Sequence, residues 1–442
     1  MKKILYFFVY LWSLYLIPSD ESINFELPAF EEESIRVDMS SSTTTWTKPL
    51  IIDANNHDFD NVDTVRLTEN IIYKPNPNYV YPQIYTYYPA AIIIAKDNVT
   101  IDLAGFNMSL QQTTNANFMI NNPIYAIAVY KGVKNVKIIS SSPHNRKASI
   151  SGFSGYAIYI NGFNESYNNY DMYSLLVKNI IIDNLLITQN INGIYIANAL
   201  QATITNTDII YNYSPRVLYG INYQTVLNGL IDNCRINQNY SYTDVYGISL
   251  QDTICVDIKN CQTNINRSLK NGNAFGMSIT ATSPTTSYTN NIYNCISNRN
   301  LCSYVSDKMS AGYYIGNQSH HNQIKESTAY FSSHTQLFPG AIAPITPPEG
   351  NGILLDSTNF NYLSNNTVGF HDTYGIADRA AVSSSFFTSN MAILNVGGNY
   401  EIRVPTGSGS IRLPTYVLYS YDVTAFTGSD AQLQNLEVVI PS

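Results

Sequence analysis

Short runs of alternating apolar and polar residues recur along the chain. Three successive segments align without gaps, and each opens with a glycine followed by an apolar residue. These glycines, Gly193, Gly220 and Gly247, stand 27 residues apart. Within each segment the alternation has a period of two and β-branched residues dominate, which is typical of strands. No apolar period of 3.6 residues is sustained over a helix length, so the pattern predicts an all-β protein.

The aligned segments share columns of identical residues. One column is apolar and two hold asparagine: Ile204, Ile231, Ile258; Asn206, Asn233, Asn260; Asn212, Asn239, Asn266. The repeat continues with looser spacing at Gly276, Gly312 and Gly352, and Ala91, Ala126 and Ala157 occupy the glycine register upstream. Three short strands in 27 residues fit one coil of a parallel β-helix. A propeller blade is excluded because it needs about 40 residues. Like residues of stacked coils then lie about 4.8 Å apart.

The two ends of the chain depart from this repeat. Residues 1–19 carry two lysines and an apolar run of fourteen residues, which predicts a secretory signal peptide, because a membrane span takes about 20 apolar residues. A retained N-terminal anchor is the alternative. Residues 20–47 read as a polar leader, and the β-helix is predicted over residues 48–397. Residues 398–442 contain several Gly and Pro and predict a C-terminal β cap or tail that covers the last coil.

Composition narrows the range of partners. The 442 residues include 24 Lys and Arg against 32 Asp and Glu, and charged residues make up 13% of the chain. The shortage of basic residues argues against nucleic-acid binding, which needs clustered Lys and Arg to neutralise phosphates. The apolar content of 45% argues against a disordered acidic protein.

The cysteines follow the repeat. There are five, Cys234, Cys255, Cys261, Cys295 and Cys302, and export would permit disulfides between them. Three of them share one column, so we expect a ladder of small buried thiols, with a vertical disulfide as the minor alternative. None has C-x-x-C spacing and no His is in register. The sequence therefore predicts no metal site and no cofactor.

Residues 96–106 resemble a segment of a known protein family. Their sequence, K-D-N-V-T-I-D-L-A-G-F, resembles the opening coil of secreted right-handed β-helix proteins, and the later coils resemble the repeats of the pectin-lyase-like superfamily. The resemblance covers about residues 48–397. It implies a single-stranded right-handed parallel β-helix of about ten or more coils. It does not imply one function, because the superfamily holds lyases, hydrolases, esterases, epimerases, tailspikes and adhesins.

The charged residues offer weak candidates for catalysis. Asn206-Thr207-Asp208 resembles the N-T-D element of polygalacturonases, but the D-D, G-H-G and R-I-K elements of that family are missing. Asp208 and Arg235 share a column of adjacent coils, as do Asp232 and Lys259. We therefore interpret both pairs as vertical ion pairs, each worth up to about 1 kcal/mol if exposed. A polar site shared by these columns is the alternative.

Tyrosines gather in the connections between coils. Those in the central coils are Tyr167, Tyr170, Tyr173, Tyr211, Tyr213, Tyr240 and Tyr242. Loops of successive coils lie along one side of a solenoid, so these rings are expected to line one edge. Tyr combines an apolar ring with a hydroxyl, which suits sugars or a protein partner. The alternative is that the rings cover loop backbone.

Three functional hypotheses remain. The first is a secreted, cell-surface or periplasmic β-helix that binds glycan or a host or envelope surface through Tyr/Asn-rich loops, without evident catalysis. The second is a polysaccharide lyase or glycoside hydrolase, and the third is a structural envelope or appendage protein. Two or three carboxylates within about 10 Å on adjacent coils would favour the second, whereas a smooth edge of Tyr would favour the first. The sequence leans away from an enzyme and leaves the oligomeric state open.

Overall fold

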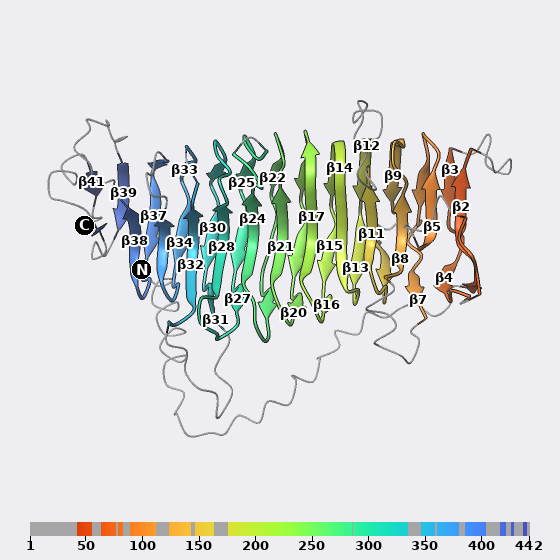
Figure 1. The fold of residues 1–442 in the computed structure, drawn as a ribbon, viewed down its shortest axis with the longest axis horizontal. Helices are drawn as coiled ribbons and strands as arrows, with labels where there is room; N and C mark the ends of the chain where they lie inside the picture. Colours follow the sequence, from red (N-terminus) through yellow and green to blue (C-terminus); the bar gives the residue numbers. More distant parts are fainter. Residues whose placement is uncertain are drawn as a thin grey trace, which may run out of the picture. The chain divides into compact units, whose positions relative to one another are not determined.

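In a computed structural model, the chain divides into residues 1–42 and the unit Thr43–Ser442, which holds every described strand (Figure 1). The residues that the structure describes are 42–54, 63–76, 78–82, 89–111, 123–142, 146–162, 176–284, 286–334, 346–358, 360–379, 385–403, 416–420, 426–427 and 436–439. The predicted signal peptide and most of the polar leader lie outside them. No helix in these ranges is long and apolar enough to cross a membrane.

The strands form four parallel ladders. The first ladder contains β2 (Leu50–Asp53), β5 (Ala90–Ala95), β8 (Tyr125–Val129), β11 (Tyr156–Asn161), β14 (Asn192–Thr205), β17 (Leu218–Leu227), β21 (Val245–Gln251), β24 (Ala274–Thr280), β28 (Met309–Gly316), β32 (Glu349–Asp356), β35 (Tyr374–Asp378), β38 (Gly398–Arg403) and β40 (Phe426–Thr427). The second contains β3 (Thr64–Arg66), β6 (Thr100–Asp102), β9 (Lys134–Ile139), β12 (Val177–Asp183), the second half of β14, β18 (Leu230–Asp232), β22 (Asp257–Lys259), β25 (Asn291–Tyr293), β29 (Gln323–Lys325), β33 (Tyr362–Ser364) and β36 (Phe386–Thr388).

The third ladder contains β1 (Thr43–Trp46), β4 (Asn70–Tyr73), β7 (Met108–Leu110), β10 (Ala148–Ser151), β13 (Leu185–Thr188), β15 (Asp208–Ile210), β19 (Arg235–Asn237), β26 (Ile296–Asn298), β30 (Thr328–Tyr330), β34 (Thr367–Gly369), β37 (Asn390–Ile393), β39 (Tyr416–Ser420) and β41 (Leu436–Val439). The fourth is short and contains β16 (Tyr213–Ser214), β20 (Tyr240–Ser241), β23 (Arg267–Ser268), β27 (Leu301–Cys302) and β31 (Ser333–His334).

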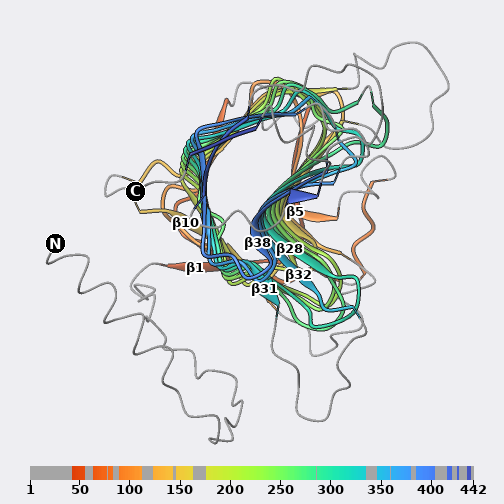
Figure 2. The ribbon, with the colours of Figure 1, turned by 90° about the vertical axis from the view of Figure 1, so that its left-hand side faces the viewer.

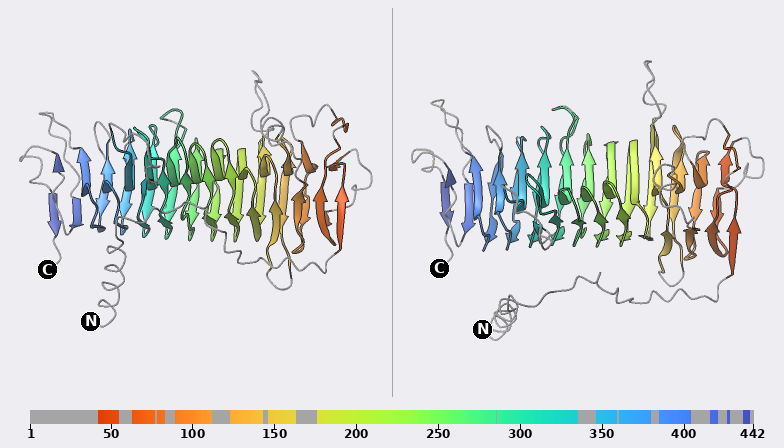
Figure 3. Two further views of the ribbon diagram at one scale, coloured as in Figure 1. Left: turned by 90° about the horizontal axis from the view of Figure 1, so that it is seen from below. Right: turned by 60° about the horizontal axis from the view of Figure 1, so that its bottom comes forward.

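The chain visits the ladders in order and then starts the next coil, so each strand pairs with its equivalent in the neighbouring coil. The expected right-handed parallel β-helix is confirmed, and right-handed connection is the rule for parallel strands. Figure 3 shows the same stack of coils from two other sides. One feature extends the sequence expectation: β38 to β41 pair in parallel with preceding strands, so the ladders continue beyond residue 397.

The register places like residues on like, as the columns predict. Ile204 pairs with Ile231 and Ile231 with Ile258. All three are fully buried and belong to one core that runs through the coils. Burial of such a side chain contributes about 1.5–3 kcal/mol. The apolar interior is thus a set of aliphatic columns, which is why a short motif can be repeated with few changes.

The recurring glycine marks a corner at which two consecutive residues face inward. A Cβ added to Gly220 would overlap Ile236 of the core and the carbonyl of Gly247 in the next coil. Ile221 also belongs to the core, while Tyr219 stacks outside it on Tyr246. The motif therefore needs glycine for close approach rather than for an unusual φ.

The two asparagine columns have different tasks. Asn206, Asn233 and Asn260 have φ of 50°, 52° and 52°, the left-handed conformation that Asn tolerates at tight turns. The Asn212, Asn239 and Asn266 column is fully buried. Asn212 donates to Oδ1 of Asn239 at 3.0 Å, and Asn239 donates to Oδ1 of Asn266 at 3.1 Å. This ladder satisfies backbone groups that the turn would otherwise leave buried and unpaired.

The cysteine column is a ladder of thiols, as expected. Cys234, Cys261 and Cys295 are buried and free, and Cys302 is also buried and free. Burial contributes to raising the pKa of the Cys261 thiol well above its usual value. These side chains act as small apolar fillers of the coil interior.

Candidate functional site

The outward side chains of the first ladder form a face that we call the concave face. Figure 2, a view along the coil axis, shows the side that carries β5, β28, β32 and β38 bending inward. Its outward positions include Tyr125, Tyr159, Tyr195, Asn222, Ser249, Ser278, Tyr314, Leu354, Ala377 and Glu401. Many of them are nearly buried although they point away from the core, so the face is recessed.

The middle of the concave face is polar and uncharged. Asn222, Ser249 and Ser278 stand one above another in consecutive coils and are 6%, 5% and 0% exposed. The Asn222 amide contacts the Tyr156 hydroxyl, but its Oδ1 atom is buried without a hydrogen-bond partner, and so is Nδ2 of Asn351 farther along the face. An unpartnered buried polar atom carries a desolvation cost of about 1–3 kcal/mol, so these atoms are suited to a partner from outside.

Aromatic rings flank this polar stretch on both sides. Tyr159 stacks on Tyr125 and Tyr195, with centroid distances of 4.4 and 5.2 Å. Beyond the polar stretch, Phe275 stacks on Tyr314 at 4.5 Å. Because the rings stack face to face along the coil axis, their faces are occupied by neighbouring rings. They present mainly edges and hydroxyl groups to an incoming molecule.

The tyrosine hydroxyls of this face are held neutral. Burial raises the pKa of Tyr156 well above its usual value, and burial likewise raises the pKa of Tyr195 and Tyr246. Tyr195 donates from its hydroxyl to Oε1 of Gln224 at 2.7 Å. The phenols therefore serve as hydrogen-bonding groups and not as bases.

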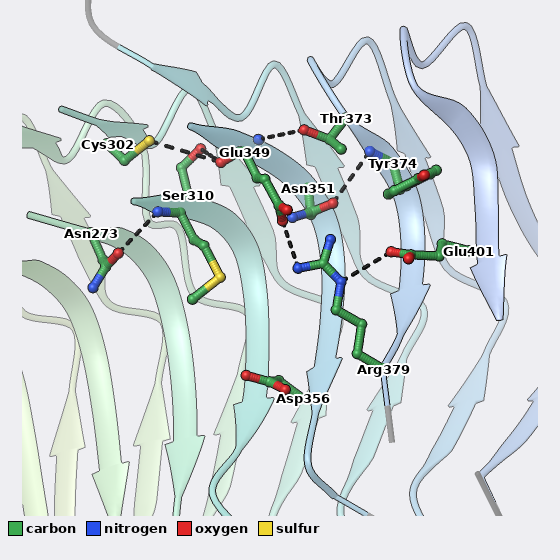
Figure 4. Close-up of polar contacts among 12 residues, drawn as sticks. Asn273, Cys302, Ser310, Glu349, Asn351, Asp356, Thr373, Tyr374, Arg379 and Glu401 are labelled. Carbon is green, nitrogen blue, oxygen red and sulfur yellow. Dashed lines mark hydrogen bonds and ion pairs between the residues drawn. The ribbon is translucent and has the colours of Figure 1, made fainter. Parts of the chain in front are cut away.

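Toward the C-terminal coils the face carries an ionic cluster (Figure 4). The Arg379 guanidinium lies between Glu349 and Glu401, with N–O distances of 2.6 and 3.0 Å. Burial alone would lower the pKa of Arg379, but its contacts with the two glutamates raise it. The cluster keeps one cation bound between two carboxylates, both on strands of the first ladder.

Two of the predicted ionic residues form a cluster with a third residue that the sequence did not predict. Asp208 accepts from Arg235 at 2.9 Å, as the shared column predicts, and also pairs with Lys147 at 3.0 Å. Asp208 and Arg235 are register partners in the third ladder. They are structural neighbours on another face of the coil and not part of the concave face.

The second predicted ion pair, between Asp232 and Lys259, does not form, although the two residues are register partners as expected. Asp232 lies opposite Lys259 in the second ladder. However, Lys259 pairs with Asp257 at 2.8 Å, two residues earlier on its own strand. Asp232 instead accepts a hydrogen bond from Asn260 at 2.8 Å. Neither residue contributes to the concave face.

The tyrosines proposed for ligand binding are only partly described. Tyr167, Tyr170 and Tyr173 lie outside the described residues. Tyr213 and Tyr240 are register partners in the fourth ladder, and Tyr213 meets Tyr242 edge to face at 5.6 Å. Tyr211, Tyr213 and Tyr242 are 38%, 43% and 44% exposed. The structure thus brings Tyr213, Tyr240 and Tyr242 together at the fourth ladder, where Tyr240 is half-buried.

Sequence reasoning missed the residues of the concave face, yet the repeat contains their signal. The residue between the two apolar positions of the motif points outward, as Tyr195, Asn222 and Ser249 do. The aromatic residue before the glycine also points outward, as Tyr219 and Tyr246 do. Arg379 and its glutamates carry no such signal, because Glu349 and Glu401 stand at different motif positions.

No group of three or more His, Cys, Asp or Glu side chains in the described ranges is placed to hold a metal ion.

No protein-family model and no curated protein matches the sequence. Among solved structures, the chain is similar to the A-module of the mannuronan C-5 epimerase AlgE6 of Azotobacter vinelandii, with 12% identity and a TM-score of 0.47 over 92% of each chain. It is also similar to pectate lyase Pel9A, with 12% identity and a TM-score of 0.39 over 86% of this chain and 78% of that one. A surface adhesin of Streptococcus pneumoniae, PfbA, is similar with 13% identity and a TM-score of 0.40 over 82% of this chain and 83% of that one. These values carry no information on activity.

Proposed function

We propose that the protein binds an extended carbohydrate chain along the concave face. The observation that carries the proposal is the polar stretch around Asn222, where a buried carbonyl oxygen lacks a partner beside Ser249 of the next coil. Each coil adds one such row at about 4.8 Å, so the face repeats along its length as a polysaccharide does. Recessed sites with a few convergent polar groups are the usual form of ligand sites.

A glycan array with the full chain tests the proposal, followed by affinity measurements on any hit. The Asn222→Ala variant should bind about tenfold more weakly, the equivalent of about 1.4 kcal/mol. Because the substitution also removes the contact of the Asn222 amide with the Tyr156 hydroxyl, thermal unfolding first establishes that the variant is folded. Asn237→Ala is the matched control, since Asn237 is an amide of the same coil on the third ladder and bonds to Asn264. Equal affinity of both variants and the parent would contradict the proposal.

Cleavage of a glycan is the second candidate function. It is favoured by Glu349 and Glu401, two carboxylates that approach the same guanidinium from strands of nearby coils. Against it stands the chemistry of glycosidases, which need two carboxyl groups that act on one glycosidic bond, whereas Glu349 and Glu401 are both engaged by the Arg379 guanidinium. Assays for reducing ends and for unsaturated products on each bound glycan decide the matter. Turnover that disappears in Glu349→Gln would establish an enzyme.

We also propose that the protein is exported to the cell surface, the periplasm or the medium. The support is the predicted signal peptide over residues 1–19. N-terminal sequencing of the protein recovered from each cell fraction tests it. Cleavage after residue 19 would establish a removed signal, and an intact N-terminus in the membrane fraction would establish an anchor.

A further inference from the structure

Over its described strands from β2 to β35, the floor of the concave face carries no positive charge. None of the first-ladder strands from β2 to β35 contains Lys or Arg. A carboxylate brought into this recessed face would lose water without gaining a counter-charge there. Such a transfer costs several kcal/mol.

Arg379, which follows β35 and reaches across the face, is already neutralised. Arg379 contacts Glu349 and Glu401, and the three side chains together carry one net negative charge. Their side chains are 15%, 33% and 15% exposed, so the pairs are shielded from salt more than surface pairs are. An anionic sugar would meet repulsion at this point rather than attraction.

The groups that the face does offer are neutral donors and acceptors. Asn222 and Ser249 supply an amide and a hydroxyl, while the Ser278 hydroxyl is fully buried and donates to the carbonyl of Ile248 at 3.5 Å. Gln224 and Gln251 stand beside them as register partners on the same strands. Amides and hydroxyls match the hydroxyl groups of an unsubstituted sugar, each of which both donates and accepts.

From these observations, and resting on the proposed function, we infer that the glycan is an uncharged polysaccharide rather than a uronic-acid polymer. Recognition is then by hydrogen bonds to sugar hydroxyls along the Asn222 row. The ionic cluster at Arg379 acts as a selectivity element, because it repels carboxylates at the C-terminal end of the row.

Isothermal titration of the full chain with oligosaccharides of equal length tests this inference. The probes are neutral hexasaccharides of glucose, mannose and N-acetylglucosamine, and hexamers of galacturonate and mannuronate, each at low and high ionic strength and with or without Ca²⁺. At least one neutral hexamer should bind with an affinity that salt hardly changes. Each uronate hexamer should bind at least about tenfold more weakly.

Uronate binding that exceeds neutral binding, including binding that needs Ca²⁺, would overturn the inference while leaving a glycan-binding protein. Failure of both classes would instead overturn the proposed function itself.

The charge cluster provides a second, independent readout. Glu401→Gln, alone and combined with Glu349→Gln, removes the partners of Arg379 and should raise affinity for the uronate hexamers, with a salt dependence that the parent lacks. Circular dichroism and thermal unfolding establish that each variant is folded. If folded variants gain no uronate affinity, Arg379 does not face the ligand and the selectivity role is wrong.

Discussion

His371 occupies a position of the buried turn column in which other coils carry asparagine. Its Nδ1 accepts from the N–H of Ser332 and its Nε2 donates to the carbonyl of Ala329, both at 3.0 Å. Its own N–H donates to Oδ1 of Asn395 at 3.0 Å. Both ring nitrogens are therefore satisfied in the neutral form, and a proton on Nδ1 would turn an accepted hydrogen bond into a clash of two donors.

Acid should destabilise the protein through this residue. Burial lowers the pKa of His371 from 6.5 to about 4. Between these two values the unfolded chain binds a proton that the folded chain does not, so stability is full above pH 6.5 and falls as the pH drops toward 4. The loss is up to about 3 kcal/mol at about 1.4 kcal/mol per pKa unit. Urea unfolding measured across this pH range should give that slope.

A pair of histidine variants isolates the effect. His371→Asn restores the residue type of the column and should remove most of the slope, even if the smaller side chain lowers stability at neutral pH. His321→Asn is the control, because His321 is exposed and has a φ of 55° that Asn tolerates. A slope that survives in His371→Asn would assign acid sensitivity to other groups.

Residue-level pairing was predictable only in part. Counting from the glycines correctly placed Asp208 beside Arg235. The same count placed Asp232 beside Lys259, but Asp257 captures that lysine. The strand register determines which Cα atoms are neighbours. A long side chain such as that of lysine can still form its ion pair with any carboxylate within its reach. The extra contact of Lys147 with Asp208 arises in the same way.

At the scale of the strand, the glycine corner is the least tolerant position of the repeat. In Gly220→Ala the new methyl group would overlap Ile236 and the carbonyl of Gly247. Because one of these obstacles is backbone, relief requires a shift of the neighbouring coil. We expect a loss of about 1–3 kcal/mol, the usual cost of overpacking, measured as a lower midpoint of urea unfolding.

Thr203→Ala serves as the comparison, since Thr203 lies on β14 and is only half-buried. Its change should stay within about 0.5 kcal/mol. Equal midpoints for Gly220→Ala and the parent would mean that the backbone at this corner can shift to accept a methyl group. The upstream coils already accept one at Ala91, Ala126 and Ala157.

The same corner explains why the concave face escaped sequence analysis. Gly220 and Ile221 both face inward, so the alternation of sides slips by one residue at each glycine. A period of two counted through the glycine assigns Tyr219 to the interior, yet it stacks outside on Tyr246. Strands, columns and their order follow from residue types, but the side on which a residue emerges beyond a bend depends on backbone geometry.

At the scale of the whole molecule, the coils share one continuous apolar core rather than the several domains that 442 residues would suggest. The repeat made this predictable, because stacked columns leave no boundary between coils. Stability should then depend on neighbouring coils more than on local propensity. The interior thiols offer a direct way to observe whether these coils open together.

Among the five cysteines, Cys255 is the exposed one, while Cys234, Cys261 and Cys302 are buried with pKa values raised above normal, to about 12 for Cys302. Thiolates react and buried thiols do not. Ellman's reagent should therefore label Cys255 in the native protein and all five thiols in guanidinium, and Cys255→Ser should abolish the native reaction.

Peptide mapping under slow native labelling should give equal rates for Cys234 and Cys261, since their coils are adjacent and open as one unit. A faster rate at one of them would mean that the coils unfold singly.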